Sequence, residues 1–125
     1  LPMYTLGHDF KPANIHAGGL RYHGAGTIVS QLIKDKMMHG VDIPQLESFE
    51  AGLLFARTEG IIPAIESAHA VAALSHLRFR PEDVVVLTVS GRGDKDVETY
   101  LAHKDGRRVR RFLTHYPNSH YESYL

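Results

Sequence analysis

The sequence predicts an α/β fold, a partial three-layer α/β/α arrangement around a mostly parallel sheet. The run VVVLTV at residues 84–89 is β-branched and apolar on both faces, a pattern typical of a central parallel strand covered by helices. Segments of helical periodicity also alternate with short extended segments along the chain. The length of 125 residues matches one domain of this kind.

Three regions follow from the distribution of turn formers. Residues 1–26 are rich in glycine and proline, and we expect a loop, which at this length is often functional in a compact domain. Residues 27–103 form the predicted α/β body, and residues 104–125 are expected to form an irregular tail. Within the body we expect helices at 27–38, 47–57, 67–77 and about 95–102, strands at 41–43 and 84–89, and an extended stretch at 61–65, where Pro63 disfavours helix before it.

Composition argues against several partner classes. Fourteen Lys and Arg residues balance fourteen Asp and Glu residues, so net charge gives no general attraction to nucleic acid or to a membrane surface. The run RRVRR at 107–111 could contact phosphates, but we favour a solvated terminus. No apolar run reaches the roughly 18 residues that a membrane span needs, and the chain has no cysteine. The expected location is therefore the cytoplasm.

Nine histidines make metal binding an alternative to weigh. Glu66 and His69 have the spacing that places a carboxylate and an imidazole on one helical face, but only one copy of this motif is present. The glycine-rich loop could gather further side chains around a cation, although their spacing matches no known ligand pattern; these side chains are His8, Asp9, His16 and His23. We favour hydrogen-bonding or solvent-facing roles for them.

Two side chains stand at positions that favour chemistry. Glu66 follows the apolar stretch GIIPAI at 60–65, which suggests a carboxylate delivered to a sheltered place. Ser90 ends the predicted strand 84–89 and opens a Gly-x-Gly turn, and ligands in parallel sheets gather at the carboxyl ends of strands. Its hydroxyl could hold a neutral heteroatom of a ligand. A helix-capping role for the same serine is equally compatible with the spacing.

Four stretches together resemble one enzyme family. YTLGHDF, IHAGGLRYHG, ARTEGIIPAIESAHA and VVVLTVSGRGDKD occur in order over residues 4–96, and they are similar to the C-terminal part of the tryptophan synthase beta chain. The second stretch resembles the type-two branch, and the last resembles the standard branch. The resemblance implies a C-terminal segment of the pyridoxal-phosphate fold of this family, and the condensation of indole with L-serine by β-replacement.

The resemblance also implies roles for individual residues. Glu66 matches the active-site acid that steers protons and orients indole, and burial beside a cofactor would raise its pKa. Ser90 and Gly91 match the cofactor-binding turn, with the Ser90 hydroxyl bonded to the pyridine nitrogen of pyridoxal phosphate. The main-chain carbonyls of Tyr22 and Gly24 match positions that bind a monovalent cation, Na⁺ or K⁺.

Several departures from the family pattern limit what the chain should do alone. Arg21 stands where the standard branch has an aspartate that contacts substrate, and the sequence has neither the His-x-x-x-Lys motif of the Schiff-base lysine nor the Gly-Gly-Gly-Ser-Asn phosphate loop. We therefore expect the last third of a beta subunit, inactive without its N-terminal remainder. Expected partners are that remainder, a second copy and an alpha subunit. The alternative is a stand-alone small-molecule or metal-binding α/β module.

Overall fold

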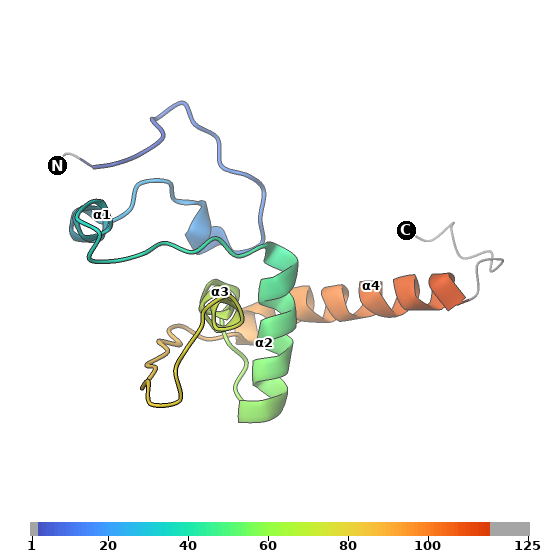
Figure 1. Cartoon of the computed structure of the whole chain (residues 1–125). Coiled ribbons are helices and arrows are strands. Elements are labelled where there is room, and N and C mark those ends of the chain that lie inside the picture. Colours follow the sequence, from blue (N-terminus) through green and yellow to red (C-terminus); the bar gives the residue numbers. More distant parts are fainter. Residues whose placement is uncertain (1–2, 116–125) are drawn as a thin grey trace.

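The chain folds into helices joined by long loops in a computed structural model (Figure 1) that describes residues 3–115, with side chains described for residues 3–106. Within this part, no helix is both long and apolar enough to cross a membrane. The elements in chain order are the 3-10 turn η1 (Gly18–Arg21), α1 (Thr27–Lys34), α2 (Gln45–Glu59), α3 (Ile65–Ala73), the 3-10 turn η2 (Asp94–Asp96) and α4 (Val97–His115).

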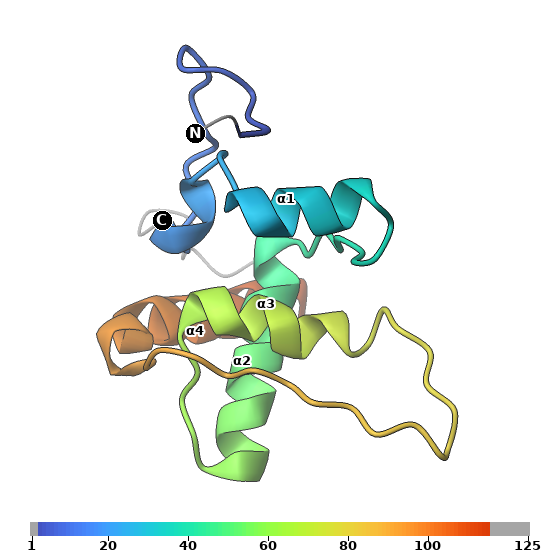
Figure 2. The same cartoon turned by 90° about the vertical axis from the view of Figure 1, so that its left-hand side faces the viewer.

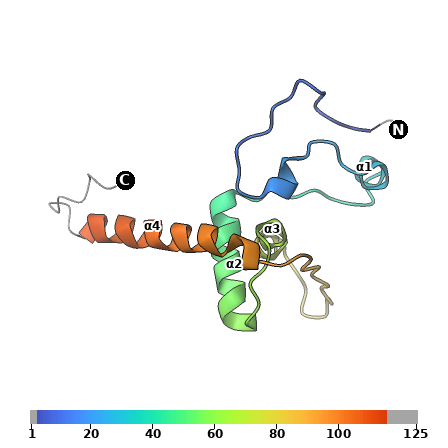
Figure 3. The same ribbon diagram turned by 180° about the vertical axis from the view of Figure 1, so that it is seen from behind.

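The core lies where three helices meet. Helix α3 crosses one side of α2 (Figure 2), and the start of α4 crosses the opposite side, from which the rest of α4 extends away (Figure 3). Phe49 of α2, Ile65 of α3 and Tyr100 of α4 are at most 4% exposed, and Ala17 of the N-terminal loop completes the cluster. The rings of Phe49 and Tyr100 meet edge to face with centroids 6.1 Å apart, a favoured aromatic geometry.

Local sequence accounts for the bounds of α2. Pro44 holds an extended conformation at the N-cap, which suits a residue without a backbone donor. Glu47 lies in the first turn and Arg57 in the last, and both charges complement the helix dipole. Gly60 ends the helix with φ +70° and donates its backbone N–H to Ala56 O at 3.2 Å. Glycine adopts this left-handed conformation without a steric penalty.

Helix α3 begins through a contact with a distant part of the chain. Its N-cap, Ala64, supplies no side-chain hydrogen bond. Instead, the backbone N–H of Ile65 donates to Asp96 Oδ2 at 3.1 Å, and the Tyr100 hydroxyl donates to the carbonyl of Pro63 at 3.0 Å. Residues 96–100 therefore satisfy backbone groups at the entry to α3 that the local sequence leaves open.

The predicted α/β fold with a mostly parallel sheet is wrong for the described residues. Residues 3–115 contain no strand, and both 41–43 and 84–89 are irregular. Val84 and Val86 are 92% and 87% exposed. A strand exists only through hydrogen bonds to a neighbouring strand, and no segment within the described part supplies one. The segment runs as an extended trace from the loop after α3 toward the start of α4 (Figure 2), and its residues 84–86 are exposed.

The helices occur near their expected positions but with different ends. Helix α1 stops at Lys34 instead of 38, and α3 stops at Ala73 instead of 77. Helix α4 continues to His115, well beyond the expected end near 102, so the part of the predicted irregular tail between 104 and 115 is helical. Residues 116–125 lie outside the described part, as do the side chains of RRVRR at 107–111.

Candidate functional site

The first turn of α3 faces both the N-terminal loop and the loop before α4. Glu66 is the second residue of α3, and its side chain is 30% exposed. Its Oε1 accepts a hydrogen bond from the backbone N–H of Gly19 in η1 at 3.2 Å, and its Oε2 accepts one from Lys95 Nζ in η2 at 3.3 Å. The carboxylate therefore connects three segments that are far apart in sequence.

Lys95 joins two carboxylates in this cluster. Its Nζ lies 2.8 Å from Asp96 Oδ2 and 3.3 Å from Glu66 Oε2. The same Asp96 oxygen accepts the N–H of Ile65, so the ammonium group, the aspartate and the start of α3 form one connected network. Charge-assisted hydrogen bonds of this kind are stronger than neutral ones.

The pKa of Glu66 depends on burial and on the hydrogen-bond donors around its carboxylate. Burial raises it, but the backbone N–H groups of Glu66 itself and of Gly19, together with Lys95, outweigh burial and hold the pKa below its ordinary value of 4.5. Hydrogen bonds and a nearby positive charge favour the ionised form. Within this chain the pKa of Glu66 is therefore lowered, and the rise expected from burial beside a cofactor stays a prediction.

Ser90 and Gly91 lie at the same end of α3 as Glu66. The buried hydroxyl of Ser67, the residue after Glu66, donates to the carbonyl of Ser90 at 2.7 Å, and the two serine Oγ atoms are 3.4 Å apart. Gly91 has φ +72° and lies against Ala64. The capping alternative for Ser90 is wrong, because Gly93 is the N-cap of the following 3-10 turn.

The Ser90 hydroxyl is chemically suited to a neutral acceptor such as a pyridine nitrogen. Ser90 is exposed, and the Ser67 hydroxyl donates its proton to the Ser90 carbonyl. The 3.4 Å separation of the two Oγ atoms is long for an O–H···O hydrogen bond. The Ser90 hydroxyl thus lies beside the first turn of α3, and its role as a cofactor ligand stays a prediction.

Tyr22 and Gly24 lie in the loop that follows η1. Tyr22 is the residue after the last turn of η1, and its side chain points into solvent with 85% exposure. Arg21, the position that departs from the family pattern, is the last residue of η1. The two carbonyls are thus close in sequence on an irregular turn, and their role as cation ligands stays a prediction.

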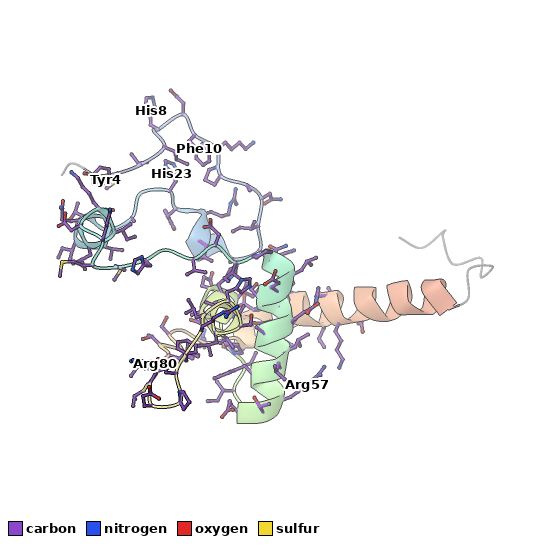
Figure 4. All side chains as sticks on the ribbon, viewed as in Figure 1. Tyr4, His8, Phe10, His23, Arg57 and Arg80 are labelled. Atoms are coloured by element: carbon purple, nitrogen blue, oxygen red, sulfur yellow. The ribbon has the colours of Figure 1, made fainter. Side chains whose placement is uncertain are left out.

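The histidines of the N-terminal loop make separate local contacts (Figure 4). His23 Nδ1 lies 2.6 Å from Thr5 Oγ1, and its ring meets Phe10 edge to face at 5.3 Å. His8 pairs with the adjacent Asp9 at 3.2 Å on the surface. Hydrogen-bonding and solvent-facing roles account for these side chains without a metal.

The other two histidines weighed as metal ligands pack near the core. The His16 ring lies 5.8 Å from Phe49. His69 Nδ1 lies 2.7 Å from the carbonyl of Ile65, and because a carbonyl only accepts, Nδ1 holds the proton. Across the residues that the structure describes, no three His, Asp or Glu side chains gather in a way that could hold a metal ion.

Two surface grooves lie beside the helices. The larger, about 640 Å³, runs between α2 and α3 and includes Leu54, Phe55 and Val71 in its lining. The smaller, about 330 Å³, includes Leu20, Asp42 and His69. Neither of these two grooves is lined by Glu66 or Ser90.

Sequence reasoning missed four members of the cluster. Lys95 lies next to Asp96 in sequence but 29 positions from Glu66. Ser67 and Asp96 form hydrogen bonds with residues 23 and 31 positions away in sequence. Gly19 contributes only its backbone N–H. Local spacing does not indicate such contacts, although the charge pattern DKD at 94–96 could have suggested a capping role.

Comparison with known proteins identifies relatives that share this region. The tryptophan synthase beta chain of Fervidobacterium nodosum is 49% identical over 102 residues, which cover 81% of this chain and 24% of that protein. The beta chain of Pyrobaculum islandicum is 50% identical over 102 residues (80% and 24%), and beta chain 2 of Thermotoga maritima is 48% identical over 106 residues (81% and 25%). The chain spans about a quarter of the length of these relatives.

The sequence profile of a family described as pyridoxal-phosphate-dependent enzymes matches residues 4–91. This match includes Glu66, Ser90 and Gly91, and it ends before Lys95. The profile covers more than half of the chain, and the relatives above agree with it. The chain belongs to the family of pyridoxal-phosphate-dependent enzymes.

Proposed function

We propose that this chain is the C-terminal segment of a tryptophan synthase beta-type enzyme, which condenses indole with L-serine to give L-tryptophan and water. The observation that supports this most directly is the hydrogen bond from Ser67 to the Ser90 carbonyl. It brings the proposed cofactor-binding turn to the helix end that presents Glu66. The relatives named tryptophan synthase beta chain support the choice of reaction, and we place the enzyme in the cytoplasm.

Glu66 is the proposed catalytic residue. Its low pKa keeps it ionised at neutral pH, so it enters the reaction as a hydrogen-bond and proton acceptor. A carboxylate can accept the N–H of indole, which orients the ring and increases electron density at its nucleophilic carbon. Because the carboxylate is held on two sides by Gly19 and Lys95, its direction is set before substrate binds.

Ser90 and Gly91 are the proposed cofactor-binding residues. Pyridoxal phosphate, when bound, supplies the electron sink for replacement of the serine hydroxyl. The Ser90 hydroxyl would donate to the pyridine nitrogen without transferring a full positive charge to it. Gly91, in a left-handed conformation with no side chain, lets the ring approach the backbone closely. The carbonyls of Tyr22 and Gly24 are proposed to bind Na⁺ or K⁺.

The proposed partner is the N-terminal remainder of the beta subunit, which would supply the Schiff-base lysine and the phosphate loop. The chain spans about a quarter of its relatives' length, and Val84 and Val86 expose apolar surface that such a remainder would cover. We further propose a homodimer of the complete subunit, with an alpha subunit as an additional partner. Without the remainder we expect the chain to be inactive.

Complementation tests this proposal. The chain is mixed with Thermotoga maritima tryptophan synthase beta chain 2 from which the matching stretch of 106 residues has been removed, in the presence of indole, L-serine and pyridoxal phosphate. We expect tryptophan to form. In the mixture, Glu66→Gln should lower kcat by about 100-fold or more, since a positioned acid–base group contributes roughly 10²–10⁴. Glu59→Gln, at the exposed end of α2, is the matched control.

The positive control is the relative's own excised segment, added back to the same truncated protein. If that segment restores tryptophan formation and this chain binds the truncated protein but restores none, the proposed reaction is wrong. If the isolated chain binds a small molecule or metal and never associates with the remainder, the stand-alone module replaces it. Equal activity of the Glu66 and Glu59 variants would remove Glu66 from the catalytic role.

A further inference from the structure

We propose that Lys95 is a positioning residue for Glu66: its ammonium group binds Glu66 and Asp96 together and so fixes the Glu66 carboxylate at the start of α3. The inference rests on the proposed function for its meaning, because it names the group that prepares the proposed catalytic acid. Lys95 lies outside the stretch that matches the family profile. Its role is therefore inferred from contacts in this chain.

The first step in the argument is the geometry around Asp96. Its Oδ2 accepts both the Lys95 ammonium at 2.8 Å and the backbone N–H of Ile65 at 3.1 Å. The side chain of Asp96 is only 13% exposed, so its position is set by packing. Lys95 is thus anchored to the residue that satisfies the first backbone donor of α3.

The second step is the direction in which Lys95 then points. Nζ also lies 3.3 Å from Glu66 Oε2, while Gly19 N–H holds Oε1 at 3.2 Å. A carboxylate bound by one donor can rotate about its last side-chain bond, whereas donors on both oxygens restrict that rotation. Lys95 therefore sets the orientation of the carboxylate as well as its charge.

The third step is the balance of charges around Glu66. The groups that act on it are Lys95, the Gly19 N–H and its own backbone N–H, and the Glu66 charge in turn acts on Tyr100. Lys95 is the one cation among them. Asp96 itself raises the pKa of Lys95, so the ammonium keeps its charge across the whole range in which Glu66 titrates. Without Lys95, burial would oppose ionisation with only backbone donors against it.

An NMR titration of the 125-residue chain tests the inference without requiring turnover. The probe is the Glu66 side-chain carboxyl carbon, and the Gly19 amide reports the same event from its partner. Lys95→Met should move the Glu66 titration midpoint upward, and the Gly19 amide shift should follow the same higher midpoint. Lys95→Arg, which keeps the charge, should leave the midpoint close to that of the parent chain. Lys11→Met, at an exposed loop position, makes the same change of charge elsewhere.

A merely structural lysine would behave differently. If Lys95→Met retains the amide spectrum of the fold and the Glu66 midpoint stays where it is, the inference is overturned. If Lys95→Met does not fold, Lys95→Gln keeps a donor for Asp96 without the charge, and its midpoint must then exceed that of Lys95→Arg. A shift of equal size in Lys11→Met also overturns it, because the effect would be one of net charge.

The two proposals fail separately. If the Glu66 midpoint shifts upward in Lys95→Met while the chain forms no tryptophan with the complementing remainder, the proposed reaction is wrong. In that case the coupling between Lys95 and Glu66 still holds. In an active mixture, Lys95→Met should move the acidic limb of the kcat profile to higher pH, and Lys95→Arg should restore it. An unshifted limb with a lowered kcat would show that Lys95 contributes only to stability.

Discussion

The contact between α2 and α3 and the run 84–89 are both apolar in sequence, yet the first is buried and residues 84–86 of the second are exposed. Phe49 and Ile65 are 3% and 1% exposed, whereas Val84 and Val86 are 92% and 87% exposed. Helices satisfy their own backbone hydrogen bonds, so two of them can pack as soon as they form. An extended segment needs a neighbour for its backbone before its side chains can be buried. Apolar character thus predicts burial only where a partner is present.

The largest expected effect comes from removing a ring on the buried side of this comparison. Phe49→Ala deletes the centre of the core cluster, where Phe49 contacts Tyr100, and should reduce the free energy of unfolding by about 3–5 kcal/mol. Val86→Ala removes apolar surface that is already in solvent, and should change it by no more than about 0.5 kcal/mol. Urea denaturation followed by circular dichroism measures both.

The same pair of variants also tests what covers the exposed run. Val86→Ala should weaken any self-association of the chain, measured by sedimentation, while its unfolding midpoint stays at that of the parent. A loss of stability in Val86→Ala as large as in Phe49→Ala would mean that the run 84–89 is buried in solution. The contrast between the two regions would then be withdrawn.

A smaller effect follows from adding a methyl group where α2 meets Tyr100. A Cβ on Gly52 would overlap the Tyr100 ring and hydroxyl, so Gly52→Ala must displace the ring and its hydrogen bond to Pro63. We expect a loss of about 1–3 kcal/mol in unfolding free energy. Gly106→Ala in α4 meets no atom within 4 Å and should instead gain up to about 1 kcal/mol from helix propensity. Thermal unfolding of the two variants in parallel gives the comparison, and equal shifts of the same sign would contradict it.

The sequence predicts the helices far better than the sheet, for the same physical reason. The periodicity and caps of α2 are local, and the helix, which ends at Glu59 before Gly60, lies close to the expected range 47–57. The expected end of α4 near 102 was too early: residues 103–106 contain one glycine and no other residue that terminates a helix, and the helix continues through them. The strand at 84–89 was inferred from composition, and composition says nothing about whether a neighbouring strand exists.

In the candidate site, too, local features could be predicted from the sequence and long-range contacts could not. Glu66 and Ser90 were identified by their positions after apolar stretches and by resemblance, and the Ser67 hydroxyl links their two segments. The direction of the Glu66 pKa could not be predicted, because it depends on Gly19 and Lys95, which are 47 and 29 positions away. Within this chain these long-range hydrogen bonds outweigh burial, and the effect of a cofactor beside Glu66 stays a prediction.

An alkaline titration should show the effect of burying Tyr100 in the core cluster. Burial, followed by the charges of Asp96 and Glu66, raises the pKa of Tyr100 to about 12, against about 10 in an unfolded chain. The folded state therefore binds a proton that the unfolded state releases, and this contribution is complete below pH 10 and lost as the pH rises toward 12. Tyr100→Phe should remove this step from a plot of unfolding free energy against pH. The step should persist in Tyr4→Phe, since Tyr4 is exposed; its loss there would contradict the assignment.

The smallest effect is expected at the acid end, where the site and the core meet. The pKa of Glu66 is lower in the folded chain than its ordinary value of 4.5, so its contribution to stability is present above that pH and is lost as the pH falls through the folded value. Because Glu66 is partly exposed, solvent screens the interaction and the change should be modest. Asp83, whose pKa Arg80 also lowers, contributes in the same range and has to be separated from it. The slope of the unfolding free energy against pH, between pH 6 and 3, should therefore be smaller in Glu66→Gln than in the parent. Lys95→Met should reproduce part of that reduction. Asp83→Asn should reduce the slope further and independently. If Lys95→Met and Glu66→Gln are instead fully additive, the ammonium group and the carboxylate do not interact in solution, and the network at the start of α3 depends on Asp96 alone.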